Sequence, residues 1–92
     1  MELTELKYRI LDKLLFAEPF DTLCEELAVP VKIIGADLKW LIAHKCVQVL
    51  RPSGDQYITS AMLDVDDMRA FHYQATALGL QHYRAHQHLF EQ

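Results

Sequence analysis

Pro19 and Pro30 limit the first half of the chain to short helices. A proline ends a helix because it lacks a backbone N–H, and it pushes the residue before it out of the helical region. Pro19 is therefore expected to end a first helix, and Val29-Pro30 a second one. Pro30 also suits the first position of a third helix. We expect helices over residues 4–16, 22–28 and 30–44.

Apolar spacing and capping residues support these helices. Thr4 is placed to cap the first helix, and Thr22 and Glu25 fit a capping box at the start of the second. Apolar residues recur every three or four positions, as on one helix face, at Leu3, Leu6, Ile10 and Leu14 in the first helix and at Ile34, Leu38, Leu41 and Ile42 in the third.

A β-hairpin is expected next. Residues 47–50 (VQVL) are rich in β-branched residues and predict a strand. Residues 52–55 (PSGD) predict a turn, because proline fixes φ and glycine allows a positive φ. Residues 56–59 (QYIT) would return as the second strand.

The C-terminal part is expected to be one long helix over residues 66–89. Three acidic residues lie at its start, where negative charges interact favourably with the helix dipole: Asp64, Asp66 and Asp67. Seven residues follow the spacing of a coiled-coil seam: Met68, Phe71, Ala75, Leu78, His82, Ala85 and Leu89. Because such a seam needs a second helix, we expect it to form a homodimer. The 92 residues make one domain, with the dimerisation helix in residues 64–92 and the other elements in residues 1–63.

Composition excludes several classes of protein. The net charge of −4 has the wrong sign for holding nucleic acid by bulk charge alone. Cys24 and Cys46 form no CxxC pair, so we expect two small buried residues in a reducing compartment. The acidic start of the chain does not resemble a signal peptide, and no apolar run approaches the ~20 residues that span a bilayer. We expect a cytoplasmic protein without a membrane partner.

The order of these elements resembles the winged helix-turn-helix superfamily, above all the small bacterial repressors of the multiple-antibiotic-resistance and arsenic-repressor types. The residues that carry the resemblance are 23–30 (LCEELAVP), 38–41 (LKWL), 45–47 (KCV) and 57–59 (YIT). It covers about residues 6–59. The implied fold is α+β: mainly α-helical with a small β-hairpin, extended by a long C-terminal helix.

The resemblance implies a homodimeric transcriptional regulator that binds double-stranded DNA, with the third helix in the major groove and the wing on the backbone. Lys32 and Lys39 would contact DNA from the third helix, and Lys45, Arg51 and Ser53 from the wing region. The sequence departs from the family on the reading face, which holds Val31, Ile33, Gly35 and Ala36 instead of hydrogen-bonding side chains. The alternative is therefore a protein-interaction module that uses the third helix and has lost DNA binding.

Neither a catalytic residue nor a cofactor is expected. Ser53 and Ser60 have no evident base, and residues 64–67 (DVDD) lack the glycine of a calcium loop. His82 and His86 have the spacing of a zinc pair on a helix, but two ligands do not make a site. We expect surface or interface histidines and no metal.

Overall fold

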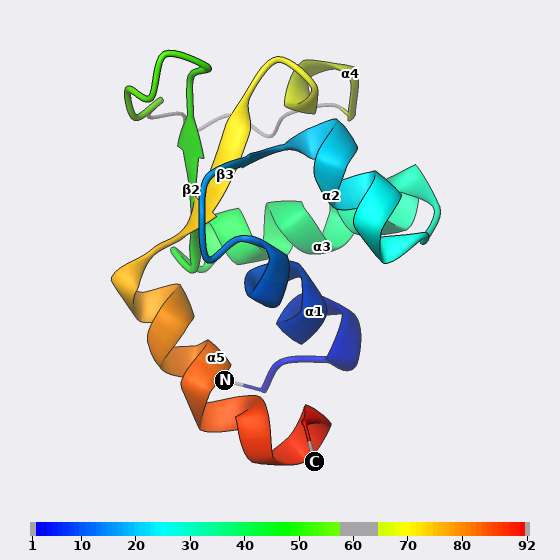
Figure 1. Cartoon of the computed structure of the whole chain (residues 1–92), viewed down its shortest axis with the longest axis vertical. Coiled ribbons are helices and arrows are strands. Elements are labelled where there is room, and N and C mark those ends of the chain that lie inside the picture. Colours follow the sequence, from blue (N-terminus) through cyan, green and yellow to red (C-terminus); the bar gives the residue numbers. More distant parts are fainter. Residues whose placement is uncertain (1, 58–64, 92) are drawn as a thin grey trace.

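The computed structural model describes residues 2–57 and 65–91 and shows an α+β fold (Figure 1). The elements follow one another along the chain as α1 (Glu5–Lys13), β1 (Glu18–Pro19), α2 (Phe20–Leu27), α3 (Val31–Ala43), β2 (Val47–Leu50), α4 (Val65–Met68), β3 (His72–Ala75) and α5 (Ala77–Phe90). The helices surround a small antiparallel sheet, and α5 extends away from the sheet beside α1 (Figure 1).

The first three predicted helices are present, but their ends differ in informative ways. Thr4 caps α1 as predicted, because its Oγ1 accepts the Lys7 amide at 3.3 Å. The capping box at Thr22 is wrong: α2 already begins at Phe20, with Pro19 as an N-cap that makes no side-chain hydrogen bond. Phe20 is fully buried, so core packing sets the start of α2. Pro30 is the N-cap of α3 and not its first residue.

The sheet has the strand order β1-β3-β2, and both pairings are antiparallel. Strand β2 matches the prediction, and the described part of the predicted return strand pairs with one end of it. Residues 56 and 57 of the predicted return strand form an isolated bridge from Gln56 to Leu50, and the Tyr57 amide donates to the Val49 carbonyl at 2.8 Å. The last two residues of that predicted strand, 58 and 59, lie outside the described residues. The full partner of β2 is β3, which pairs Val47 with Ala75 and Leu50 with His72.

The predicted continuous helix over residues 66–89 is wrong. Helix α4 ends at Met68, the chain is extended through β3, and α5 begins at Ala77. The alternate residues Tyr73 and Ala75 are buried, so this stretch has the period of a strand. Thr76 then caps α5 by accepting the Gly79 amide at 3.0 Å. As a result, β3 occupies the centre of the sheet and α5 becomes a separate helix.

A single core lies between the helices and the sheet. Its largest fully buried side chains include Tyr73 from β3, Phe20 from α2, Ile10 and Leu11 from α1, and Leu38 from α3. The Tyr73 and Phe20 rings meet edge to face at 6.4 Å, which links the centre of the sheet to α2. None of the helices in the described part of the chain is long and apolar enough to cross a membrane.

Candidate nucleic-acid interface

Helix α3 buries one face and exposes another. Ile34, Gly35, Leu38 and Leu41 lie on the buried face, whereas Lys32, Ile33 and Ala36 are exposed. The predicted reading surface is therefore only partly correct. Gly35 is buried and does not belong to the exposed face. Val31 and Lys39 are half-buried, and Val31 packs against the core.

The other predicted DNA-contacting residues lie after α3 and at the turn that follows β2. Lys45 is exposed and has a φ of +63°. The exposed Arg51 guanidinium lies 5.4 Å from the centre of the Tyr57 ring. Ser53 Oγ donates to the Asp55 carboxylate at 3.3 Å. The turn itself is confirmed: the Gly54 amide donates to the Arg51 carbonyl at 2.8 Å, and Gly54 has a φ of +99°.

Charge is unevenly distributed along the chain. Residues 31–57 contain four basic and two acidic side chains, whereas the remaining residues contain five basic and eleven acidic ones. Within the described residues, the ion pairs involve Lys7, Lys13 and Arg69, and none involves Lys32, Lys39, Lys45 or Arg51. The segment from α3 to the turn is thus the part of this acidic chain in which basic side chains outnumber acidic ones.

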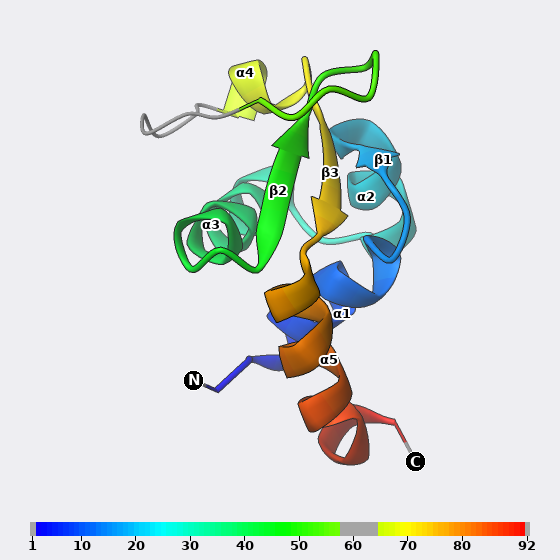
Figure 2. The ribbon, with the colours of Figure 1, turned by 90° about the vertical axis from the view of Figure 1, so that its left-hand side faces the viewer.

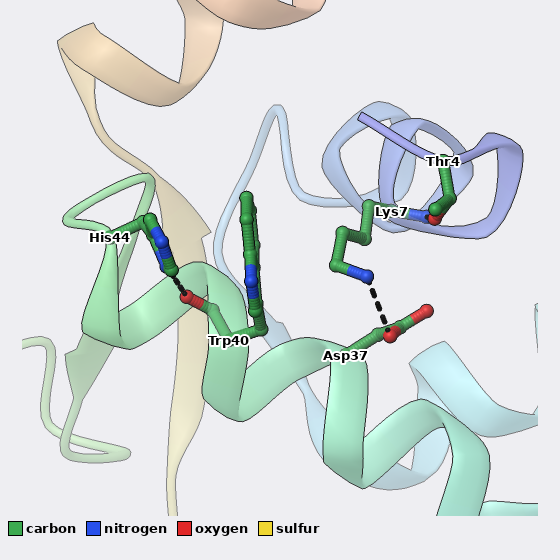
Figure 3. Close-up of polar contacts among 5 residues, drawn as sticks. All are labelled: Thr4, Lys7, Asp37, Trp40 and His44. Carbon is green, nitrogen blue, oxygen red and sulfur yellow. Dashed lines mark hydrogen bonds and ion pairs between the residues drawn. The ribbon is translucent and has the colours of Figure 1, made fainter. Parts of the chain in front are cut away.

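A cluster between α1 and α3 removes one of the two acidic charges from this segment. Lys7 Nζ lies 3.0 Å from Asp37 Oδ1, and the two side chains are 14% and 20% exposed (Figure 3). The same ammonium lies 4.9 Å from the Trp40 ring, whose other side stacks on His44 at 3.7 Å. This arrangement fixes α1 against α3 and neutralises the carboxylate of α3. No local pattern predicts this ion pair, because Lys7 and Asp37 are 30 residues apart.

The structure disperses the predicted dimerisation seam. Met68 and Ala75 are buried in other elements, and Phe71 stacks on Tyr57 at 4.6 Å. The four remaining positions stay on α5, where Leu78 is 40% and Leu89 is 56% exposed, Ala85 is exposed and His82 is half-buried. A seam of seven positions is therefore wrong, because β3 interrupts it. Only the α5 portion remains on one helix.

His86 uses both ring nitrogens inside the protein. The Leu3 amide donates to Nε2 at 3.2 Å, and Nδ1 lies 2.7 Å from the His82 carbonyl. Since an amide N–H can only donate, Nε2 is the unprotonated nitrogen and Nδ1–H donates to the carbonyl. His86 is 8% exposed. Because it accepts the Leu3 amide, it holds the N-terminal segment against α5.

Replacing His86 with phenylalanine is expected to lower the free energy of unfolding by about 1–3 kcal/mol, because the Leu3 amide loses its acceptor in a buried place. Urea denaturation measures the change. The exposed His88 lies on the same helix, and His88→Phe is the matched control that should stay within about 0.5 kcal/mol of the wild type. Equal stability of His86→Phe and the wild type would contradict this role.

The described residues contain no group of three or more histidine, cysteine, aspartate or glutamate side chains that could hold a metal ion. Cys24 is half-buried and Cys46 is buried, and both are free thiols. Burial raises the pKa of both thiols above the usual range. A raised pKa keeps the thiols protonated and therefore weak as nucleophiles.

The candidate interface thus consists of the exposed part of α3 and the basic residues that follow it, Lys45 and Arg51. Comparisons of the chain with models of protein families, with curated proteins and with solved structures gave no significant match.

Proposed function

We propose that the protein is a winged helix-turn-helix regulator that binds double-stranded DNA through α3. The element order and the central position of β3 in the sheet support this fold. The observation that carries the function is the charge distribution: residues 31–57 hold four basic and two acidic side chains in a chain of net charge −4. Within the part of the chain that the structure describes, none of these four basic side chains is in an ion pair.

In the proposed complex, α3 lies in the major groove. Lys32 and Lys39 contact phosphates and set the position of the helix on the duplex. The exposed Ile33 and Ala36 then face the base edges, where apolar side chains contact thymine methyl groups. The turn brings Arg51 to the sugar–phosphate backbone of the DNA. Within the turn, Ser53 Oγ donates to the Asp55 carboxylate and orients it.

The proposed regulator acts as a homodimer. The exposed Leu78, Ala85 and Leu89 with the half-buried His82 form a stripe along α5 that a second copy would cover. Two copies would then bind two half-sites about one helical turn apart. Analytical ultracentrifugation of the full chain tests this part of the proposal independently of DNA.

The test of DNA binding is fluorescence anisotropy of a labelled mixed-sequence duplex, measured from low to physiological salt. Affinity is expected to fall linearly with salt on a log–log plot. Lys32→Gln combined with Lys39→Gln should reduce the slope by about 1.8, because each lost phosphate contact removes about 0.9. Arg84→Gln removes an exposed charge from α5 and is the matched control, with an expected slope equal to that of the wild type. Absence of binding at low salt would refute the proposal.

The exposed Ile33 favours a second candidate function, a protein-interaction module that uses α3. Ile33 is 49% exposed and cannot form a hydrogen bond to a base edge. Ile33→Lys distinguishes the two functions. An added cation should strengthen DNA binding at low salt, whereas it should weaken docking of an apolar protein surface.

A further inference from the structure

His44 lies at the C-terminal end of α3, where it is the C-cap residue and its side chain is exposed. Its ring stacks on the Trp40 ring, with 3.7 Å between the ring centres and 20° between the planes (Figure 3). Nδ1 of His44 lies 2.8 Å from the Trp40 carbonyl oxygen. Figure 2 shows the turn from α3 into β2 on the outer side of the molecule, where no other helix or strand lies in front of it. The two contacts with Trp40 therefore fix an exposed imidazole at the end of the proposed DNA-binding helix.

The hydrogen bond shows which nitrogen of His44 can take up a proton. A carbonyl oxygen can only accept, so Nδ1 carries a hydrogen and donates it to the Trp40 carbonyl. Nε2 is then the unprotonated nitrogen of the neutral ring, and within residues 2–57 and 65–91 it makes no hydrogen bond. Protonation of Nε2 therefore breaks neither the hydrogen bond nor the stacking contact.

The position of His44 favours a positive charge. The last carbonyl groups of a helix carry partial negative charge and stabilise a nearby cation. The last turn of α3 contains no basic residue, so His44 is the group that can supply this cation. Protonation also makes the hydrogen bond to the Trp40 carbonyl charge-assisted and adds a cation–π contact with the indole ring.

Lys7 of α1 is the charged group that faces His44 across the Trp40 ring (Figure 3). Its Nζ lies 4.9 Å from the centre of that ring. Asp37 Oδ1 lies 3.0 Å from the same Nζ, so the charge of the ammonium is paired and opposes a second cation less than a free one would. Among the described residues, no ion pair involves His44 itself.

The neighbours of His44 along the chain and at the start of α5 do not block its protonation. Lys45 is exposed, so water weakens its repulsion. The Cys46 thiol donates to the His44 carbonyl at 3.7 Å, and burial raises the pKa of this thiol, which keeps it uncharged. Thr76, the N-cap of α5, donates its hydroxyl to the Lys45 carbonyl at 2.6 Å and carries no charge.

We propose that protonation of His44 strengthens DNA binding through α3, so that the protein binds DNA more tightly at acidic than at neutral pH. A histidine side chain can change its charge between pH 5 and 8. The proton adds a cation to residues 31–57 and places it next to Lys45, one of the proposed phosphate contacts. The inference rests on the proposed function of α3 and adds a phosphate contact that pH controls.

The first test measures the charge of His44 without DNA. Trp40 is the single tryptophan of the chain, and a protonated imidazole that stacks on an indole ring quenches its fluorescence. The emission of the full chain should fall in one step between pH 8 and 5, whereas that of His44→Gln should stay level. His88→Gln removes an exposed histidine of α5 and is the matched control that should keep the step. A wild type without the step would overturn the proposal, whether or not the protein binds DNA.

The second test compares the salt dependence of DNA binding at about pH 5.5 and about pH 8. Acidification should steepen the log–log slope of the wild type by about 0.9 more than that of His44→Gln, because one phosphate contact is added. From about 50 to 200 mM salt, the part of the gain in affinity that depends on His44 should therefore shrink about 3.5-fold. The histidines outside α3 are present in both proteins, so their contribution cancels, and His88→Gln should behave as the wild type.

The outcomes separate this inference from the proposed function. Equal pH dependence of the wild type and His44→Gln would overturn the inference and leave DNA binding intact. Absence of binding at both pH values would refute the proposed function and the inference with it.

Discussion

Replacing Gly79 with alanine should destabilise the protein by about 3 kcal/mol, although alanine is the better helix former by about 1 kcal/mol. A Cβ atom at position 79 would lie 2.0 Å from the Cys46 carbonyl oxygen and 2.9 Å from its carbonyl carbon. Both atoms belong to the backbone, so neither can move aside as a flexible side chain would. Helix α5 must therefore shift away from the turn between α3 and β2.

That shift would break the contacts that hold the start of α5. The Thr76 amide donates to the Cys46 carbonyl at 2.9 Å, and its Oγ1 donates to the Lys45 carbonyl at 2.6 Å. The same hydroxyl accepts the Gly79 amide at 3.0 Å. Each lost hydrogen bond costs about 1 kcal/mol, which adds to the cost of the overlap.

Thermal unfolding followed by circular dichroism measures the effect. A loss of about 3 kcal/mol corresponds to a decrease in Tm of about 12–24 °C for a domain of this size. Gln81→Ala is the control: Gln81 is exposed on the same helix, and the substitution should change stability by less than about 0.5 kcal/mol. A Gly79→Ala variant at least as stable as the wild type would show that the close approach is not required.

Local sequence signals predicted the first half of the fold well. Thr4, Pro19 and Pro30 act through the backbone of their own neighbourhood, so the helices α1, α2 and α3 lie within a few residues of the predicted ranges. Strand β2 was predicted over the same residues, 47–50. Local signals are sufficient for these ranges, except for the start of α2, which the packing of Phe20 in the core sets.

The second half could not be predicted in the same way, because its pattern fits two structures. Phe71 and Ala75 are four residues apart, as on a helix, whereas Tyr73 and Ala75 alternate, as on a strand. Pairing with β1 and β2 decides for the strand. Thr76, three residues before Gly79, was the local sign that a new helix begins there.

The candidate interface was predictable in part. Lys32, Ile33 and Ala36 are exposed as predicted, because the apolar spacing of α3 defines which face is buried. Gly35 was misplaced, since a residue without a side chain gives no hydrophobic signal for its face. The central position of β3 in the sheet was also unpredictable, because its residues were predicted to lie in the long C-terminal helix.

The stability of the protein should fall above pH 10, and Tyr73 is expected to cause part of that fall. Tyr73 is fully buried, and burial raises its pKa above the usual value of 10. Its Oη donates to the Met68 carbonyl at 2.7 Å, which only the protonated phenol can do. Burial likewise raises the pKa of Tyr8. The pKa of Tyr83 is also raised, mainly by its hydrogen bond to Asp12 and to a smaller extent by burial.

The direction follows from proton binding. Above pH 10 the unfolded chain has lost the phenolic proton, whereas the folded protein keeps it until its raised pKa is reached. The unfolded state then binds fewer protons, so the free energy of unfolding decreases as pH rises. Tyr73 should contribute a slope of about −1.4 kcal/mol per pH unit. Below pH 10 both states hold the proton, and this contribution is fully present.

Tyr73→Phe separates the two roles of the phenol. At pH 7 the variant should be less stable than the wild type by about 1 kcal/mol, because the hydrogen bond to Met68 is lost. Above pH 10 it should lose stability less steeply, since phenylalanine has no proton to release. Urea denaturation at intervals from pH 7 to about 11.5 therefore gives two curves that converge and then cross within about one pH unit above 10. Phe20→Leu is the control: it weakens the same ring contact but should keep the alkaline slope of the wild type. Equal slopes for the wild type and Tyr73→Phe would show that the buried phenol of β3 does not limit stability in alkali.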